Sequence, residues 1–405
     1  MNISVLTSSY PRFKGDGTAP FVKSIAEALA KLGHKIEIVA PYDIAVRDDL
    51  ASIVKVHRFK YIWPASLHIM GHARTLKADV NLHPLALILL PFFLLASIFK
   101  LIRVSRKMGA EAIHAHWVLP NGFAAAIASK VLRIPFIISL HGSDMFMADR
   151  NFLFRAVARW TFNQCSSVTA CSQELHDRAK MINKNVLIDI IPWGADPNIF
   201  KPANSKDNLR KKYNWSKKEL IITTLGRMVY KKGFDQLILI AKELAKINPK
   251  IKLVIGGSGP LQDSLRDMAK GQRVLDIVLF PGRIPWNEVS DFMAASDIFV
   301  LPSRRDKAGN LDGLPTVLLE AMACGLPAVA NDIGGVNLVI EDHKNGILNK
   351  QLDLVGLKKG LSQLIIDKDL RMRIGQNARM SVVNKFNWKN TSQNIEKLLQ
   401  NAVDQ

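Results

Sequence analysis

Short runs of apolar, often β-branched residues alternate with longer amphipathic stretches along most of the chain. In the first half, the runs that predict strands are 3–7, 35–40, 53–59, 112–116, 136–140, 168–171 and 186–191. In the second half they are 220–225, 252–255, 278–280, 298–301, 327–330 and 346–348. Apolar residues spaced three or four apart fill most of the intervals and predict helices. This alternation is typical of an α/β fold with parallel sheets and crossover helices.

A polar, basic stretch at 201–218 interrupts the alternation, and the strands resume at 220. We therefore expect two doubly wound domains, 1–196 and 197–385. We also expect a C-terminal helix in 386–405 that packs back toward the first domain. Ligands of such sheets bind at the carboxyl ends of the strands, so the expected site lies in a cleft between the two domains.

The composition is that of an ordinary soluble globular protein. The 405 residues are 48% hydrophobic and 22% charged, which excludes disorder and collagen-like repeats. The three cysteines, Cys165, Cys171 and Cys324, form no CxxC pair and indicate neither a disulfide framework nor a zinc site. The first residues predict a strand rather than a signal peptide, so we expect a cytoplasmic protein.

The formal net charge of +20 predicts attraction to polyanions: nucleic acids, anionic membranes or phosphorylated small molecules. Basic residues occur in both halves, and the chain has no zinc-finger, RNP or basic-zipper signature. We therefore expect no nucleic-acid partner, although a basic nucleic-acid-binding protein stays the alternative from another functional class. The string Gly256–Pro260 does not fit GxGxxG, which argues against a dinucleotide-dependent oxidoreductase.

The loop after strand 220–225 begins with Gly226 and Arg227 and ends with Lys232 and Gly233, where a helix is expected to start. An Arg fork, a Lys charge and the N–H groups at a helix N-terminus together suit a diphosphate. The alternative is that these are solvated charges on a surface loop.

A second element runs from Asp312 to Pro327. Pro315 can occupy the first helical position and Gly325 can end the helix. The carboxylates of Asp312 and Glu320 can accept hydrogen bonds from sugar hydroxyls. The alternatives are that Asp312 only caps the helix and that Glu320 is a solvated helix residue.

Together these motifs resemble the retaining GT-B glycosyltransferases of family 4, the glycosyl transferases group 1. Matching strings in the first half are Gly15-Asp16-Gly17, His114-Ala115-His116-Trp117, His141-Gly142-Ser143-Asp144 and 191–196. The resemblance implies two Rossmann-like domains of the GT-B fold. It also implies transfer of a sugar, with retention, from a nucleotide-diphospho-sugar donor to a saccharide or lipid-linked acceptor in cell-surface polysaccharide biosynthesis. A synthase or phosphorylase of the same fold that acts on a soluble disaccharide is the alternative enzyme.

Carried over residue by residue, the resemblance implies that Arg227 and Lys232 bind the donor diphosphate and that Glu320 holds the ribose. Asp312 would contact the transferred sugar, with His141 beside it. The remaining donor contacts would be made by Gly17, Gly226, Leu314 and Thr316. The roles of His114, His116 and Asp144 stay open.

We expect no metal or other cofactor, because cations and helix N-termini can stabilise the departing diphosphate. The only Asp-x-Asp string, Asp367-Lys368-Asp369, lies in a helical surface pattern far along the chain.

The chain departs from the family pattern at three positions. Asp312 stands where the family usually has Glu, and the missing methylene shortens its reach by about 1.5 Å. Pro315 replaces a frequent glycine and removes one N–H donor. Leu338 follows Gly334-Gly335 in a stretch where the family tends to have Glu.

The stretch 84–99 is almost wholly apolar, with Pro91 in its middle, and the basic residues Lys100, Arg103, Arg106 and Lys107 follow at helical spacing. A membrane span is disfavoured because the stretch lies between two strands of one predicted sheet. Two interpretations stay open. The segment 84–107 either docks on an anionic membrane surface, which would make the protein peripheral on the inner face of the plasma membrane, or forms a buried crossover helix.

Overall fold

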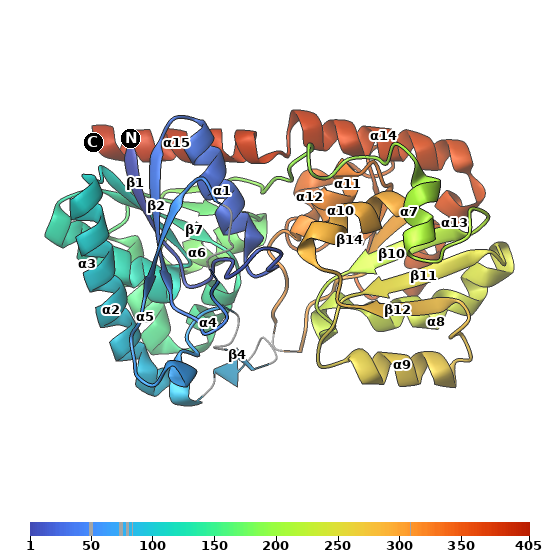
Figure 1. The fold of residues 1–405 in the computed structure, drawn as a ribbon, viewed down its shortest axis with the longest axis horizontal. Coiled ribbons are helices and arrows are strands. Elements are labelled where there is room, and N and C mark those ends of the chain that lie inside the picture. The colour runs from blue at the N-terminus through green and yellow to red at the C-terminus, as the bar shows by residue number, and fades with distance from the viewer. Residues whose placement is uncertain (48–51, 73–75, 78–80, 83, 308) are drawn as a thin grey trace. The chain divides into compact units, whose positions relative to one another are not determined.

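The computed structural model describes residues 1–47, 52–72, 76–77, 81–82, 84–307 and 309–405. The chain divides into two compact units, which we call the first and second domains. The first domain contains Met1–Pro192 and Trp388–Gln405, and the second contains Trp193–Asn387. Each is built on a parallel sheet with helices on both faces (Figure 1). The two doubly wound α/β domains expected from the sequence are therefore confirmed.

The sheet of the first domain has the strand order β3-β2-β1-β6-β7-β8-β9, with every pair parallel. Its strands are β1 (Asn2–Leu6), β2 (Lys35–Pro41), β3 (Lys55–Phe59), β6 (Ala112–His116), β7 (Phe136–Leu140), β8 (Ser167–Ala170) and β9 (Ile188–Ile190). A separate antiparallel pair, β4 (Leu76–Lys77) and β5 (Asn81–Leu82), was not expected from the sequence. The winding direction reverses between β1 and β6, so the topological switch point lies there.

The helices of the first domain are α1 (Pro20–Lys31), α2 (Pro84–Met108), α3 (Phe123–Leu132), α4 (Ser143–Arg150), α5 (Phe152–Phe162), α6 (Gln173–Ile182) and α15 (Trp388–Asp404). Successive residues of β1 face opposite layers, as a pleated strand requires. Ile3 and Val5 belong to the core formed with α1 and α15, whereas Ser4 accepts a 2.8 Å hydrogen bond from Ser105 of α2. Because Leu399 of α15 is fully buried in this core, the C-terminal helix is part of the first domain.

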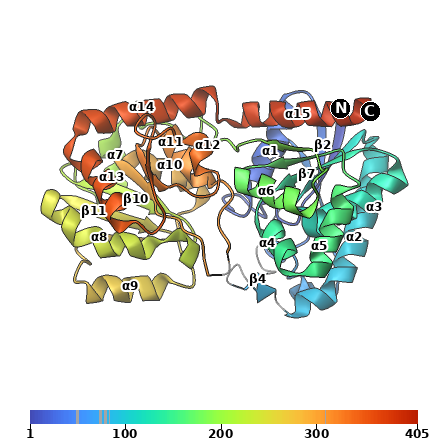
Figure 2. The ribbon, with the colours of Figure 1, turned by 180° about the vertical axis from the view of Figure 1, so that it is seen from behind.

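The second domain has the strand order β12-β11-β10-β13-β14-β15, again all parallel. Its strands are β10 (Leu220–Leu225), β11 (Ile251–Gly256), β12 (Val278–Gly282), β13 (Ile298–Leu301), β14 (Ala328–Asn331) and β15 (Ile347–Asn349). Its helices are α7 (Lys206–Lys212), α8 (Phe234–Ile247), α9 (Gln262–Gly271), α10 (Trp286–Ala295), α11 (Thr316–Ala323), α12 (Val336–Val339), α13 (Leu354–Ile366) and α14 (Lys368–Asn384). Helices α8 and α13 pack side by side over one face of the sheet (Figure 2). The switch point lies between β10 and β13.

Helix α7 lies within the polar stretch that the sequence pattern suggested as a break between domains. Arg210 of α7 is 4% exposed, donates to the carbonyl of Ala295 at 3.1 Å and pairs with Asp297. A buried guanidinium that is fully paired ties the helix to the second domain. The high charge of this stretch therefore belongs to a packed helix rather than to a linker.

Candidate donor site at the second switch point

The loop Gly226–Gly233 follows β10 at the switch point and is held against the end of the neighbouring strand β13. Gly233 has φ of 66°, and a Cβ there would lie 2.0 Å from the carbonyl oxygen of Pro302. The Gln236 side-chain amide donates to the same oxygen at 2.7 Å. This close approach requires glycine and fixes where the preceding lysines emerge.

The start of the same loop packs against the loop after β11. Gly226 N–H donates to the carbonyl of Gly256 at 3.1 Å, and a Cβ on Gly257 would lie 1.9 Å from the Gly226 oxygen. Arg304 braces the middle of the loop, because its Nε donates to the Tyr230 carbonyl at 3.1 Å and its Nη1 donates to Asp235 at 2.9 Å. Arg304 could not be identified from the sequence, because only the fold brings its partners to it.

Two lysines of the loop share one carboxylate. Lys232 Nζ donates to Asp312 Oδ2 at 2.6 Å, and Lys231 Nζ lies 3.1 Å from Asp312 Oδ1. Burial opposes ionisation of Asp312, but the two nearby ammonium groups outweigh burial and hold the Asp312 pKa well below its usual range. The three side chains therefore carry a net charge of +1 at neutral pH.

Asp312 and Lys232 are thus brought together by the fold, as the family resemblance implied. Lys231 was missed by the sequence analysis, and its adjacency to Lys232 was the available signal. Arg227 lies in the same loop and is exposed, in contrast to the half-buried Lys232.

The helix α11 begins beside this cluster. Pro315 is its N-cap rather than its first helical residue, so the sequence prediction was wrong by one position. Pro315 has ψ of 113°, and this extended backbone places it just outside the helix. Gly325, with φ of 75°, follows the C-cap as predicted. The first-turn N–H groups of a helix have no intrahelical partner, so Thr316 begins a segment that favours anions.

The turn before α11 is fixed by backbone contacts. Gly335 N–H donates to the Gly313 carbonyl at 2.5 Å. Gly334 has φ of 64°, and a Cβ on it would lie 2.3 Å from the backbone carbonyl oxygen of Asp312. Leu314 is 1% exposed, so the whole residue is buried in the second domain. Asp312 does not cap α11, because the helix has no side-chain cap and the Asp312 carboxylate pairs with the lysines.

Glu320 lies in the second turn of α11, four residues after Thr316. Its side chain is partly buried, and this burial raises its pKa to about 7. The alternative of an ordinary solvated helix residue is therefore wrong. A partly buried carboxylate one turn from a helix N-terminus can accept two hydrogen bonds from a diol.

In the first domain, two histidines meet at the carboxyl ends of neighbouring strands. His116 ends β6 and His141 follows β7, and His116 Nδ1 lies 2.9 Å from His141 Nε2. The rings of Trp117 and Phe21 lie 4.5 and 4.8 Å from the His141 ring. Burial lowers the pKa of both histidines well below 6.5, so both imidazoles are neutral at pH 7.

The other two polar residues of these motifs, His114 and Asp144, have partners of their own within the first domain. His114 is fully buried, and its Nε2 lies 2.8 Å from Ser139 Oγ. The Asp144 carboxylate accepts hydrogen bonds from Val118 N–H at 2.8 Å and Gly142 N–H at 3.1 Å. Asp144 therefore holds the loops that carry Trp117 and His141, which is a structural role.

Gly17 lies in the loop between β1 and α1, next to the first switch point. It is exposed, and a Cβ added to it would meet no atom within 4 Å. The neighbouring Asp16 fixes the loop through Arg12, whose Nε donates to it at 2.7 Å. The fold of this domain therefore gives no reason for glycine at position 17.

In the part of the chain that the structure describes, no three histidine, cysteine, aspartate or glutamate side chains gather in a metal-binding group. Asp367 of the Asp-x-Asp string is the N-cap of α14 and accepts a 2.8 Å hydrogen bond from Leu370 N–H.

Comparison with known proteins agrees with this geometry. The profile of the glycosyl transferases group 1 family matches residues 205–381, and the profile of Glycosyltransferase Family 4 matches residues 15–199. The chain therefore belongs to the group 1, family 4 glycosyltransferases.

Two relatives and one solved structure illustrate the relationship. The N-acetyl-alpha-D-glucosaminyl L-malate synthase of Bacillus anthracis is 25% identical over 95% of this chain and 93% of its own. The GDP-mannose-dependent alpha-(1-6)-phosphatidylinositol monomannoside mannosyltransferase of Mycolicibacterium smegmatis is 28% identical over 73% of this chain and 79% of its own. HepE of Anabaena, solved with UDP-glucose, superimposes with a TM-score of 0.72 at 20% identity, covering 99% of this chain and all of that one. This likeness shows the GT-B fold.

Proposed function

We propose that this glycosyltransferase moves a hexosyl group from a nucleotide-diphospho-sugar to a saccharide or lipid-linked acceptor, with retention and without a metal ion. The proposed setting is cell-surface polysaccharide assembly on the cytoplasmic side of the membrane. The observation that carries the proposal is the pairing of Lys231 and Lys232 with Asp312 beside the N-terminus of α11. A relative that uses GDP-mannose and a fold neighbour that binds UDP-glucose support a nucleotide-sugar donor.

In this proposal the donor diphosphate is bound by Arg227, Lys232 and the first-turn amides that begin at Thr316. Asp312 fixes the position of the Lys232 ammonium group, which would supply positive charge to the diphosphate together with the α11 amides. Charge develops on the diphosphate as the glycosidic bond breaks. Preorganised cations and amides therefore stabilise the transition state more than the bound donor.

The carboxylates would hold the sugars at either end of the diphosphate. Glu320 would accept hydrogen bonds from the ribose hydroxyls, and Asp312 from the hydroxyls of the transferred sugar. The lysines keep Asp312 ionised, so it can act only as an acceptor there. Gly17 would allow the loop after β1 to approach the donor closely, which accounts for a glycine that its own domain does not require.

His141 would lie beside the transferred sugar as a neutral imidazole. His116 Nδ1 lies 2.9 Å from His141 Nε2, so one of the two rings donates to the other and the orientation of the His141 ring is fixed. A neutral ring held in this way can orient the sugar but is a poor proton donor.

For retention, the acceptor hydroxyl would attack the anomeric carbon from the face that the phosphate leaves. The bond from the anomeric carbon to the phosphate oxygen breaks, the bond to the acceptor oxygen forms, and the departing phosphate takes the hydroxyl proton. The lowered pKa of His141 makes this imidazole a weak base, which favours transfer of the proton to the departing phosphate.

Thermal stabilisation by UDP-, GDP- and ADP-sugars, followed by transfer assays in the presence of EDTA, tests the proposal. The correct donor at 100 times its dissociation constant should add about 2.7 kcal/mol. Arg227→Ala and Lys232→Ala should each cost about 2 to 4 kcal/mol of transition-state stabilisation. Lys242→Gln, at an exposed position of α8, serves as a control. Unchanged turnover in both variants would remove the diphosphate assignment. Phosphorolysis of a soluble disaccharide would instead support the phosphorylase alternative.

A further inference from the structure

Helix α2 presents a continuous apolar stripe to solvent along its first four turns. Five large apolar side chains of the stripe are exposed: Leu87, Ile88, Phe92, Leu95 and Phe99. Ile88, Leu95 and Phe99 are 66%, 68% and 69% exposed. Ile88, Phe92, Leu95 and Phe99 follow one another at intervals of four, three and four residues, which places them on one face of the helix. Soluble monomers rarely expose so many large apolar residues together, and such patches mark interaction surfaces.

The opposite stripe of α2 belongs to the core of the first domain. Leu89, Phe93 and Leu101 are each at most 3% exposed, and the helix packs against α3 and the strands β1, β2 and β3. The 25-residue helix is long and apolar enough to cross a membrane, but only 28% of its most apolar window is buried in the protein. Crossing would strip the buried stripe from the sheet. The helix is therefore suited to lie on a surface rather than to span a bilayer.

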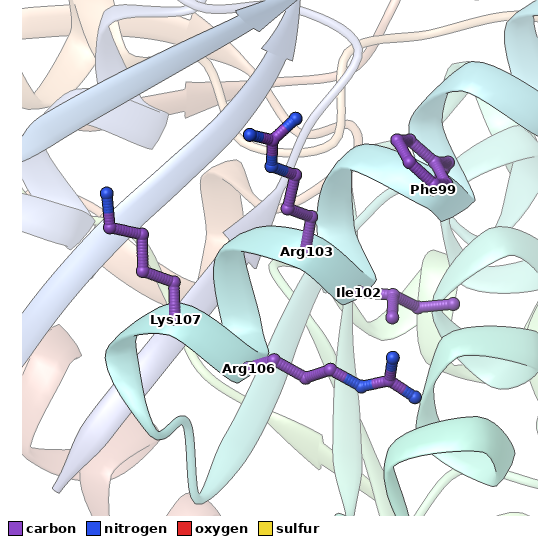
Figure 3. A pocket seen from close by; sticks show the side chains of 5 residues that line it. All are labelled: Phe99, Ile102, Arg103, Arg106 and Lys107. Atoms are coloured by element: carbon purple, nitrogen blue, oxygen red, sulfur yellow. The ribbon is translucent and has the colours of Figure 1, made fainter.

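The exposed apolar stripe continues into basic residues at the C-terminal end of α2. Arg103, Arg106 and Lys107 are exposed, and together with Phe99 and Ile102 they line a shallow hollow (Figure 3). The segment Pro84–Met108 contains no acidic residue. None of the three basic side chains pairs with a carboxylate among the residues that the structure describes. One face of a single helix thus carries apolar area followed by uncompensated positive charge.

We propose that this face of α2, which we call the α2 face, docks on an anionic phospholipid surface. The apolar stripe would enter the boundary between headgroups and acyl chains, and Arg103, Arg106 and Lys107 would contact lipid phosphates. The net charge of +20 draws the chain toward such a surface and opposes pairing of this face with a second copy of the same chain. The α2 face lies outside the residues of the proposed donor site, so the docking proposal stands or fails independently.

Both parts of the α2 face should contribute measurably to docking. Each Lys or Arg near an anionic bilayer strengthens binding about fivefold, and this gain disappears in high salt. Each large apolar side chain that enters the interface adds a comparable factor that salt does not remove. Docking therefore requires both the apolar stripe and the basic residues. Simple electrostatic adsorption of a basic protein would require only the positive charge.

Co-sedimentation of the full chain with vesicles tests the proposal, using phosphatidylcholine alone or mixed with phosphatidylglycerol. The apolar variant carries Ile88→Ser, Leu95→Ser and Phe99→Ser, and its control carries Val355→Ser and Ile366→Ser, which remove exposed apolar residues of the second domain. The basic variant carries Arg103→Gln, Arg106→Gln and Lys107→Gln. Its control carries Lys242→Gln, Lys246→Gln and Lys250→Gln, so that the same charge is removed from exposed sites elsewhere. Circular dichroism and thermal melting establish that each variant is folded.

We expect the wild type to bind only the mixed vesicles, and both α2 variants to bind more than tenfold more weakly while the controls bind like the wild type. Hydrolysis of a soluble nucleotide-sugar should stay unchanged in all variants. Equal weakening by the lysine control would show adsorption through net charge alone and would overturn the proposal. Absence of vesicle binding, binding to pure phosphatidylcholine that salt does not affect, or a dimer that the apolar variant dissociates would each overturn it as well.

Discussion

Replacing Glu320 by Gln should stabilise the ligand-free protein at alkaline pH while it weakens donor binding. The variant keeps the shape of the side chain and removes its charge. The pKa of Glu320 rises from 4.5 in the unfolded chain to about 7 in the folded protein because burial disfavours the carboxylate. Between these two values the folded state binds more protons than the unfolded state, so Glu320 makes stability fall as the pH rises.

The expected size of this effect follows from the two pKa values. Each pH unit between 4.5 and about 7 contributes 1.36 kcal/mol, which gives at most about 3 kcal/mol at pH 8. Solvent that reaches the half-buried carboxyl group reduces this value. For a domain of roughly 200 residues, 1 kcal/mol shifts the melting midpoint by about 2–4 °C, so the variant should melt up to about 10 °C higher at pH 8. At pH 4.5 the wild type and the variant should melt alike.

Thermal melts of the two proteins from pH 4.5 to 8.5 measure the stability difference. Glu243→Gln on α8 is the matched control, because Lys358 lowers the pKa of this exposed carboxyl and the substitution should not stabilise the protein. Calorimetric titration with a nucleotide-sugar measures the affinity of each protein for the donor. The donor is preferable to a nucleoside diphosphate, whose terminal phosphate itself titrates near pH 6.

If the ionised carboxylate binds the ribose, wild-type affinity should fall up to tenfold per pH unit below 7, and the variant should be weaker and insensitive to pH. A variant that is no more stable than the wild type at pH 8 would refute the burial argument. A stabilised variant that binds the donor normally over the whole pH range would instead remove Glu320 from the ribose site.

Three further predictions concern the other candidate residues. Asp312→Asn should lower turnover strongly but leave nucleotide affinity equal or higher, because it makes the lysine cluster more positive; parallel loss of both in kinetic and binding assays would contradict a sugar contact. His116 and His141 should stay neutral at pH values well below 6.5 in nitrogen NMR spectra, and titration of either ring near 6.5 would show that burial does not lower its pKa. Gly17→Ala should leave the melting temperature unchanged and reduce transfer, because a Cβ at position 17 meets no atom within 4 Å. Gly233→Ala should destabilise the protein, because a Cβ there would lie 2.0 Å from the carbonyl oxygen of Pro302. A stable Gly233→Ala variant would count against the described loop.

The central strands were predictable from the sequence because they are short buried runs. The runs 112–116 and 136–140 coincide with β6 and β7, and 220–225 and 298–301 coincide with β10 and β13. Helix ends were less predictable, as the displacement of Pro315 to the N-cap shows. Local residue preferences specify that a helix starts near Pro315, but the turn that Gly334 and Gly335 support decides the first helical residue.

The side-chain partnerships could not be derived from the chain alone. Lys232 and Asp312 are 80 positions apart and meet because parallel strands end at one edge of the sheet. Lys231 shares the same carboxylate, although the sequence analysis left it out. His116 and His141 likewise follow neighbouring strands, so only the strand order makes them partners.

The sequence by itself determined the class of the fold, the order of its elements and the identity of the polar residues that follow the strands. These properties depend on local patterns of burial and on turn chemistry. The tertiary structure decided which charges neutralise each other, which carboxyl is forced toward its protonated form and which stripe of α2 stays in water. These outcomes depend on distance and desolvation, and both arise only when segments remote in sequence are packed together.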